Sequence, residues 1–336
     1  AYEISLGLLG SEMCIRDREY TKAFDGVELT SLEVGPGAVD EGFRSADPLL
    51  VEILYRAAER IAAFHQHQVR NSFLVNEEDG ILMGQKVLPL ARVGLYVPGG
   101  TAAYPSSVLM NVIPAKVAGV ERIIMLTPPG ADGKVNPGTL AAANIAGVDE
   151  IYKAGGAQAI AAMAFGTESI PKVDKITGPG NIFVALAKKA CFGYVSIDSI
   201  AGPSEILVIA DETANPRYVA ADLLSQAEHD ELASAILITT SESTAAKVSE
   251  EIDGFLSSLS RSDTIRKSLD NYGYILIADS LDSAIDTANE IASEHLEILT
   301  KDPYSVMTKI RNAGAIFLGE YSSCLLYTSP SPRDRG

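Results

Sequence analysis

The run Ile206-Leu207-Val208-Ile209-Ala210 gives the clearest indication of the architecture of this chain. A short, unbroken apolar run is typical of a strand that is buried on both faces, as the strands of a parallel sheet are. Similar runs recur along the chain, at residues 123–126, 235–239, 274–278, 296–299 and 315–318.

Segments with helical periodicity lie among these runs, at residues 49–64, 108–118 and 245–259. Strands that alternate with helices predict an α/β fold with βαβ connections. Turns at Pro98-Gly99 and Gly202-Pro203 bracket a segment that could be one domain inserted in another. With 336 residues, of which 47% are hydrophobic, the chain is long enough for two domains with their own cores. No internal repeat is visible.

The composition predicts a soluble enzyme. The net charge of −17 argues against a nucleic-acid partner, because nucleic-acid phosphates would be repelled. No apolar run approaches the length that spans a membrane. Cys14 and Cys324 lie near the ends of the chain, and Cys191 alone cannot form an internal disulfide. This cysteine usage fits a reducing cytoplasm.

A first candidate site is the pair Gln226 and His229. Asn215-Pro216 is a typical helix start, with a capping residue followed by proline, and the residues after it follow a helical apolar rhythm. Residues three apart on a helix share a face, so the two side chains could converge on a metal or a polar ligand. The alternative is a solvated glutamine and a helix-end histidine that meets the last carbonyls.

A second candidate is the dipeptide Glu294-His295, which lies between an amphipathic helix and the strand-like run 296–299. Such a junction places side chains on backbone that a rigid sheet holds still. A carboxylate beside an imidazole offers two proton acceptors of different basicity, which suits general acid and base chemistry near neutral pH. Taken alone, the dipeptide is weak evidence.

A third candidate lies around Asn181, which can cap a helix at 182–191. Gly178 and Gly180 before it would let the backbone approach a phosphate. The alternative is a glycine turn with no ligand. No GxGxxG fingerprint follows any predicted strand, so the sequence does not indicate a standard dinucleotide-binding turn.

Taken together, these segments resemble histidinol dehydrogenase. The stretches that carry the resemblance stand in the family's order, at residues 92–100, 154–161, 176–181, 201–205, 225–229 and 293–297. The resemblance extends from about Glu19 to Ser322, and it implies two Rossmann-like domains with mostly parallel sheets, one inserted in the other. It further implies oxidation of L-histidinol through L-histidinal to L-histidine, by two hydride transfers to NAD, in a homodimer. This is the last step of histidine biosynthesis.

The resemblance also implies roles for single residues. Gln226 and His229 match two zinc ligands, and the zinc is thought to hold the imidazole and amine of the substrate. His295 matches the base that takes the alcohol proton, and Glu294 the group that activates water for attack on the aldehyde. Gln226, His229 and His295 thereby also count as substrate-binding residues.

Four further residues match the family's ligand contacts. Tyr96, Gln158 and Asn181 correspond to NAD contacts, and Ser204 corresponds to a substrate contact. Each of these, taken singly, would be read as an ordinary loop or cap residue.

The predicted division assigns residues 19–95 and 204–322 to a discontinuous catalytic domain, and residues 96–203 to an NAD-binding Rossmann-like domain. Residues 1–18 and 323–336 look like translated sequencing adapter and are excluded from fold reasoning. The Gly-Asp-Tyr and Asn-His-Leu motifs and the later Glu and His that family members carry beyond the run 315–318 are not found. Two of the family's four protein ligands to zinc are among them. The chain as written is therefore expected to bind zinc weakly and to turn over little.

Two alternatives to an active histidinol dehydrogenase remain. One is a catalytically silent relative that binds NAD or a partner, and the other is an NAD-dependent dehydrogenase of another amino alcohol. The presence of Glu294 and His295 together with Gln226 and His229 favours the active enzyme over the silent relative, which would not need all four.

Overall fold

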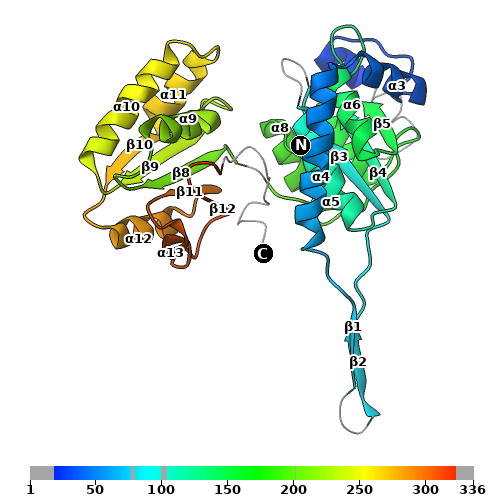
Figure 1. Cartoon of the computed structure of the whole chain (residues 1–336). Coiled ribbons are helices and arrows are strands. Elements are labelled where there is room, and N and C mark those ends of the chain that lie inside the picture. The colour runs from blue at the N-terminus through cyan, green and yellow to red at the C-terminus, as the bar shows by residue number, and fades with distance from the viewer. Residues whose placement is uncertain (1–18, 77–79, 100–103, 201, 323–336) are drawn as a thin grey trace. The chain divides into compact units, whose positions relative to one another are not determined.

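The computed structural model describes residues 19–76, 80–99, 104–200 and 202–322. They form two compact units, which divide after Ile200 (Figure 1). The segments predicted to be artefact-like, 1–18 and 323–336, lie outside the described residues. Among the described residues, no helix is both long and apolar enough to cross a membrane.

The first unit is built on a five-stranded parallel sheet with the order β5-β4-β3-β6-β7. Its strands are β3 (Arg92–Tyr96), β4 (Arg122–Thr127), β5 (Glu150–Lys153), β6 (Lys175–Thr177) and β7 (Ser196–Ile197). A short π-helix, η1 (Thr21–Asp25), precedes its helices, which are α3 (Pro36–Ser45), α4 (Pro48–Gln66), α5 (Pro105–Val117), α6 (Pro137–Ala146), α7 (Gly156–Phe165) and α8 (Ile182–Cys191).

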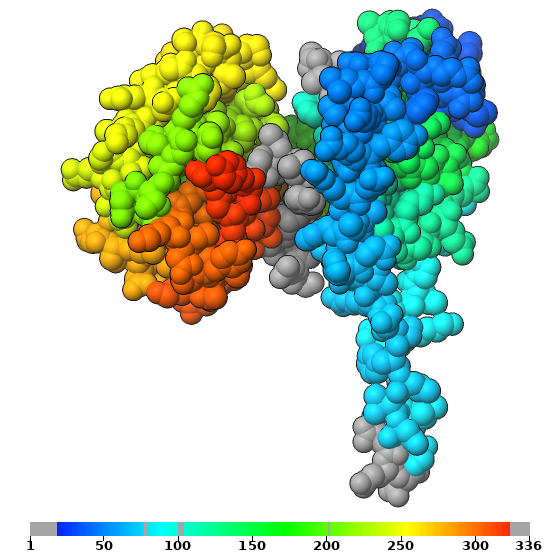
Figure 2. Space-filling view, viewed as in Figure 1, coloured from blue at the N-terminus to red at the C-terminus, as the bar shows by residue number. Residues whose placement is uncertain are grey.

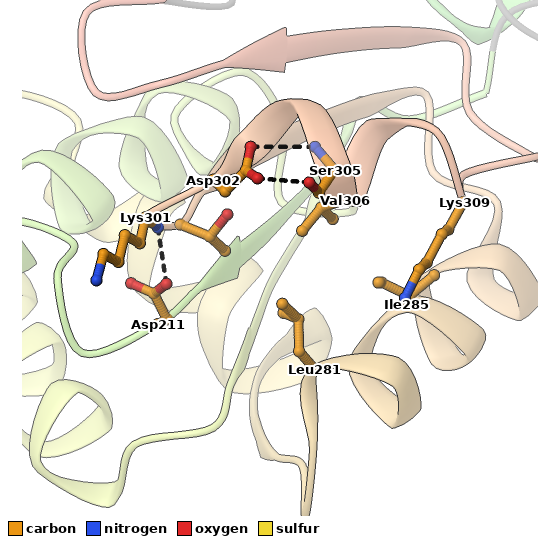
Figure 3. Close-up of a pocket in the computed structure, with 9 residues that line it drawn as sticks. Asp211, Leu281, Ile285, Lys301, Asp302, Ser305, Val306 and Lys309 are labelled. Carbon is orange, nitrogen blue, oxygen red and sulfur yellow. Dashed lines mark hydrogen bonds between the residues drawn. The ribbon is translucent and has the colours of Figure 1, made fainter.

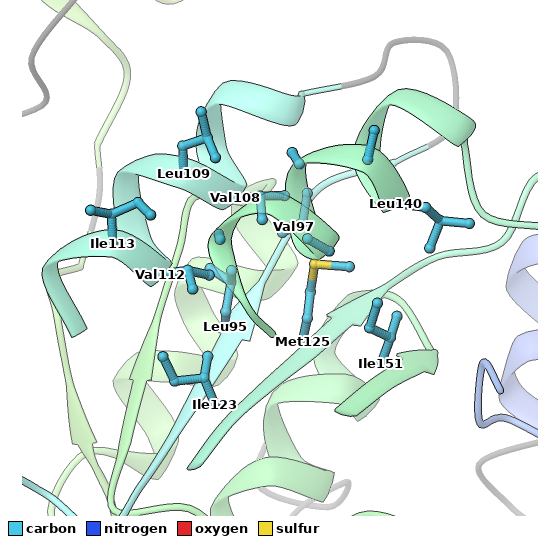
Figure 4. Packing of buried hydrophobic residues seen from close by; sticks show 14 of the residues in the cluster. Leu95, Val97, Val108, Leu109, Val112, Ile113, Ile123, Met125, Leu140 and Ile151 are labelled. Atoms are coloured by element: carbon cyan, nitrogen blue, oxygen red, sulfur yellow. The ribbon is translucent and has the colours of Figure 1, made fainter. Parts of the chain in front are cut away.

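Alternate residues of the central strands enter two separate cores. Leu95 and Met125 pack with α4, α5 and α6 on one face of the sheet, as Figure 4 shows for the residues around them. Ile124 and Leu126 pack with α7 and α8 on the other face. Burial on both faces explains the unbroken apolar run from Ile123 to Leu126 within β4, which is typical of parallel strands.

A two-stranded antiparallel hairpin extends from this unit, formed by β1 (Phe73–Asn76) and β2 (Leu82–Gln85). All eight of its strand residues are exposed, and they include apolar side chains. Leu74 is 69% and Leu82 is 59% accessible to solvent. Figure 2 shows the hairpin as a narrow arm that stands clear of the rest of the first unit. A two-stranded hairpin is only marginally stable by itself in water. Exposed apolar surface of this kind marks a site of interaction with another protein surface.

The second unit repeats the same topology, with a parallel sheet in the order β10-β9-β8-β11-β12. Its strands are β8 (Glu205–Ala210), β9 (Ser234–Thr239), β10 (Gly273–Ile277), β11 (His295–Leu299) and β12 (Ala315–Leu318). Its helices are α9 (Pro216–Ala227), α10 (Glu242–Leu256), α11 (Ser262–Tyr272), α12 (Leu281–Ile291) and α13 (Pro303–Met307). The first three helices share one core with the sheet, and the last two share the other.

In each unit the first strand is central, the next two strands extend the sheet to one side, and the last two extend it to the other. This is the 3-2-1-4-5 order of doubly wound sheets, in which the strand order reverses between the first and the fourth strand. The predicted α/β class with two Rossmann-like domains is confirmed. The two units are also topological repeats, which the sequence did not reveal.

The structure divides the chain differently from the predicted division. Residues 19–95 were expected to join residues 204–322, but they pack with residues 96–200 instead. The boundary at 95/96 falls within β3, which pairs with β4 and β6 at the centre of the first sheet. In addition, α4 packs against α5 and α6, because its apolar stripe joins their core. The assignment of catalysis to one unit and of NAD binding to the other stays a prediction.

Candidate active site

Glu294 and His295 lie at the amino end of β11, beside the amino end of β8. The register pairs His295 with Ile206, so the histidine ring stands next to the start of the central strand. Nδ1 of His295 lies 3.1 Å from the backbone carbonyl oxygen of Glu205. A carbonyl oxygen can only accept, so Nδ1 carries the proton and donates it, and Nε2 of the neutral ring keeps its lone pair.

A carboxylate from β8 fixes the neighbouring backbone. The N–H of Glu294 donates to Oε2 of Glu205 at 3.3 Å. Oε2 of Glu294 lies 3.8 Å from Nδ1 of His295, and the two side chains are 32% and 14% exposed. The ring of Phe317 on β12 stacks on the imidazole with a centroid distance of 6.2 Å. Two proton acceptors are therefore held side by side, partly shielded from water.

The turn before this pair is strained. Ala292, which ends α12, has φ 54° and ψ 48°, and it is the one non-glycine residue with positive φ among the described residues. Ser293 beside it is 2% exposed, and its hydroxyl donates to the backbone carbonyl of His295 at 3.0 Å. Strained backbone of this kind persists only where its surroundings hold it in place.

Replacing Ala292 with glycine is expected to stabilise the protein by about 0.5–1 kcal/mol, because glycine adopts the left-handed conformation without steric cost. Urea unfolding measures the difference. Ala221→Gly, at an exposed position within α9, is the matched control and is expected to destabilise by about 1 kcal/mol. A loss of stability in Ala292→Gly would show that the turn is not strained.

The side chain of Gln226, near the end of α9, is only 4% exposed. The predicted alternative of a solvated glutamine is therefore wrong. A polar side chain in such a position needs hydrogen-bond partners, and a ligand could be one of them.

His229 lies just beyond α9, which ends at Ala227, and not on the helix as expected. The residue is exposed to solvent. Loss of water around the ring lowers the pKa of His229, Glu228 opposes this shift, and Arg261 and His295 add to it. His229 directly follows α9, which packs on β8, and β8 pairs with the strand that begins at His295. The structure therefore brings the end of α9 and the start of β11 into one site.

The fit of this site to zinc rests on the donors themselves. Neutral imidazole is a common zinc ligand, and a lowered pKa keeps His229 neutral. The side-chain amide of Gln226 offers an oxygen as a second ligand. Among the described residues, no group of three or more His, Cys, Asp or Glu side chains could hold a metal. The second unit thus offers two donors that fit zinc, and Ser204, half-buried directly before β8, lies at the same edge of the sheet.

A pair of carboxyl groups, one of them fully buried, joins α9 to β11. Glu297 is fully buried on the strand that begins at His295, and its side chain is hydrogen-bonded to that of Asp222 on α9. Burial raises the pKa of Asp222, and the hydrogen bond from Glu297 partly opposes that rise. A hydrogen bond between two carboxyl groups requires a proton on one of them. This bond fastens the helix of Gln226 to the strand of His295.

Removing one member of this pair is expected to be costly. Glu297→Ala leaves Asp222 without its partner and opens a cavity, so we expect a loss of about 3 kcal/mol in the free energy of unfolding. Glu297→Gln keeps a donor for Asp222 and should lose less than about 1 kcal/mol. Urea unfolding of the two variants makes the comparison. Equal losses in the free energy of unfolding for the two variants would contradict a hydrogen bond between Glu297 and Asp222.

The pair also predicts a pH dependence. The folded state raises the pKa of Asp222 above 3.8, so its contribution to stability is complete below that pH and disappears as pH rises through the raised value. The side chain of Asp222→Asn cannot ionise. As pH rises from 3.8 through the raised pKa of Asp222, the free energy of unfolding of the wild type should therefore fall relative to that of Asp222→Asn. A difference that is constant with pH would contradict the raised pKa.

The predicted NAD contacts lie at the carboxyl edge of the first sheet. Tyr96 ends β3 and is 4% exposed, and its hydroxyl oxygen accepts the N–H of Gly156 at 3.1 Å. Burial raises the pKa of Tyr96. Gln158 lies in the first turn of α7 and is 7% exposed. Asn181 is exposed and, as expected, caps α8, with Oδ1 accepting from the N–H groups of Phe183 and Val184.

The glycine loop that contains Gly178 is held in place by hydrogen bonds with the side chains of Asp198 and Lys188. Gly178 has φ +112°, and a Cβ atom there would lie 2.0 Å from the carbonyl oxygen of Tyr96. Its N–H donates to Oδ2 of Asp198 at 2.7 Å, and its carbonyl accepts from Nζ of Lys188 at 3.1 Å. Lys188 is 2% exposed and also pairs with Asp198. This edge, at the switch point between β3 and β6, is where doubly wound sheets bind ligands.

Sequence reasoning missed the supporting residues of both sites. Glu205, Asp222 and Glu297 in the second unit, and Lys188 with Asp198 in the first, were not assigned roles. One signal was available, because a glutamate inside the apolar run 296–299 requires a buried partner. The identity of that partner could not be read from the sequence.

Comparison with known proteins gives a consistent result. Residues 17–327 match the family model described as histidinol dehydrogenase. The histidinol dehydrogenase of Clostridium acetobutylicum is 58% identical, over 90% of this chain and 70% of its own length. That of Aquifex aeolicus is 57% identical, over 91% of this chain and 71% of its own.

Solved structures agree at the level of the fold. A histidinol dehydrogenase from Elizabethkingia anophelis matches with a TM-score of 0.93 and 38% identity, covering 99% of this chain and 78% of that one. A propionaldehyde dehydrogenase from Clostridium phytofermentans matches with a TM-score of 0.52 and 14% identity, covering 99% and 90%, which shows a shared fold alone. From the family model and the identity to curated relatives, the chain belongs to the histidinol dehydrogenase family of oxidoreductases.

Proposed function

We propose that this protein oxidises L-histidinol to L-histidine with NAD, and that the second unit carries the proton-transfer groups. The observation that carries the proposal is the orientation of His295. Its Nδ1 donates to the carbonyl of Glu205, which leaves the Nε2 lone pair free to accept a proton, and the carboxylate of Glu294 lies 3.8 Å from Nδ1. A fixed tautomer with a neighbouring carboxylate suits a base that must take a proton in a defined direction.

Two proton acceptors match the two oxidation steps. In the first, Nε2 of His295 removes the hydroxyl proton of the alcohol as hydride leaves the carbon. In the second, the carboxylate of Glu294 removes a proton from the water that adds to the aldehyde, and the hydrate loses the second hydride. Phe317 and the half-buried position of the pair limit access of bulk water.

Gln226 and His229 are proposed to hold zinc, whose chemistry would be to bind and orient the imidazole and amine of the substrate. Ser204 is proposed as a further substrate contact. Tyr96, Gln158 and Asn181 are proposed to bind NAD at the carboxyl edge of the first sheet. Because the Tyr96 hydroxyl is engaged with Gly156, this residue would act mainly by shaping the edge on which NAD lies.

A comparison of two substrates distinguishes this proposal from the alternative of a dehydrogenase that acts on another amino alcohol. The gene product that contains residues 19–322 should reduce NAD at least about 100-fold faster, in kcat/KM, with L-histidinol than with L-phenylalaninol, since the latter cannot ligate zinc through its ring. Similar rates on both alcohols would contradict the histidinol assignment. NAD binding without any turnover on L-histidinol would favour the silent relative.

We also propose that the protein is a cytoplasmic homodimer. The exposed apolar hairpin of β1 and β2 supports an interface of the first unit with another chain. Leu82→Asp on this arm should shift the sedimentation coefficient from that of a dimer towards that of a monomer. A monomeric wild-type protein would contradict the proposal.

A further inference from the structure

A cavity of about 350 Å³ lies at the carboxyl edge of the second sheet (Figure 3). It begins where β8 and β11 end, at Asp211 and Thr300, and it is covered by α12 and α13. The catalytic pair lies at the opposite, amino edge of the same strands, so this cavity is separate from the candidate active site. Its volume is within the range of small-molecule sites, about 300–1,000 Å³.

The position of the cavity is the one at which doubly wound sheets bind ligands. In the order β10-β9-β8-β11-β12, the direction of winding reverses between β8 and β11. Helices to either side of this point diverge and leave a crevice outside the carboxyl ends of the strands. The first unit is proposed to use its equivalent crevice for NAD, whereas nothing in the proposed reaction uses the crevice of the second unit.

The acidic groups around the cavity are already engaged. Oδ2 of Asp211 accepts the N–H of Lys301 at 2.8 Å, and its Oδ1 accepts the N–H of Thr213 at 2.9 Å. Asp302 accepts the N–H and hydroxyl of Ser305, as the dashed lines in Figure 3 show. These contacts fix the loops that form the rim of the cavity.

Two donors are open. The hydroxyl oxygen of Thr300 is buried and has no hydrogen-bond partner, and the residue, which lines the cavity, is 9% exposed. The ammonium group of Lys301 has no ion pair among the described residues. The other lysine at the rim, Lys309, is paired with Asp282 at 2.6 Å. A buried hydroxyl without a partner is costly, and a ligand with an acceptor oxygen would satisfy it.

The walls of the cavity are aliphatic. Leu281 and Ile285 come from α12 and Val306 from α13. Figure 3 shows the side chains of Leu281 and Val306 directed toward each other across the space, with Lys301 at one end and Lys309 at the other. Such walls favour a short, branched hydrocarbon body without polar groups.

We propose that this crevice is a second small-molecule site that binds a short aliphatic carboxylate. The hydrocarbon body lies against Leu281, Ile285 and Val306, and the carboxylate accepts from the Thr300 hydroxyl and faces the Lys301 ammonium. This proposal does not depend on the proposed function, because it uses none of the catalytic residues.

The test uses 4-methylpentanoate as the probe and NMR of the methyl-labelled full chain as the readout. We expect saturable shifts at the methyl groups of Leu281, Ile285 and Val306, with a Kd on the order of 1 mM or tighter. The uncharged 4-methylpentanamide should bind about tenfold more weakly, because its contact with Lys301 is no longer charge-assisted.

Variants separate this site from unspecific binding. Thr300→Val and Lys301→Gln should each weaken binding of the probe about tenfold. Lys247→Gln, at an exposed position on α10, is the matched control and should not change it. Lys301 lies in an exposed loop, so its variant keeps the test valid if Thr300→Val does not fold. Absence of shifts at the three wall residues, or equal binding of acid and amide, would overturn the proposal.

Discussion

Replacing His295 with asparagine is expected to lower kcat for L-histidinol oxidation by about 10²–10⁴-fold, the usual contribution of a positioned general base. The asparagine amide can still donate to the carbonyl of Glu205, as Nδ1 does, so the backbone at the start of β11 should keep its position. What is lost is the lone pair of Nε2. The KM for NAD should stay unchanged, because the predicted NAD contacts lie in the other unit.

Steady-state kinetics and a thermal unfolding curve measure these two effects. His67→Asn is the matched control, since His67 is an exposed residue at the end of α4, and it should keep wild-type kcat. A His295→Asn variant with a folded spectrum and more than about a tenth of wild-type kcat would exclude His295 as the base.

Replacing Gly178 with alanine is expected to disrupt the first unit, at a cost on the order of 4 kcal/mol or more. The alanine Cβ would lie 2.0 Å from the carbonyl oxygen of Tyr96, which belongs to the central strand and cannot move away cheaply. The loop held by Asp198 and Lys188 would have to shift, so NAD binding should be lost together with stability.

Gly193→Ala is the control that separates two effects of Gly178→Ala. These are the steric clash with the carbonyl oxygen of Tyr96 and the cost of a positive φ in any non-glycine residue. Gly193 has φ +101°, but a Cβ atom there meets nothing within 4 Å. Its alanine variant should therefore lose only about 1–2 kcal/mol and keep NAD affinity. Urea unfolding and NAD titration of both variants decide the matter, and equal losses would show that the contact with Tyr96 is unimportant.

The buried parallel strands could be predicted because burial on both faces demands unbroken apolar runs, as at 206–210. The central strand β3 could not, since Gly94 interrupts its pattern. A Cβ atom at Gly94 would lie 2.5 Å from Sδ of Met163, so a larger residue there would require the side chain of Met163 on α7 to move. The domain boundary was missed for the same reason, because it was placed at a strand that the sequence did not reveal.

The candidate site likewise has residues that the sequence indicates and residues that it does not. Glu294, His295, Gln226 and His229 could be proposed because the short motifs that contain them resemble those of histidinol dehydrogenase, although each motif taken alone is weak evidence. Their supports could not, because the bonds to Glu205 and from Glu297 to Asp222 join residues that are far apart in the sequence. The crevice at Thr300 was also missed, since it depends on how four separate segments pack.

The most direct test of the proposed reaction is the amount of NADH formed for each L-histidinol consumed by the gene product that contains residues 19–322. Two oxidation steps at one site predict two NADH and one L-histidine for each L-histidinol, in the wild-type protein. Glu294→Gln, which cannot activate water, should release the second NADH much more slowly than the first. One NADH per L-histidinol in the wild type, with an aldehyde as the final product, would contradict the assignment of these two residues.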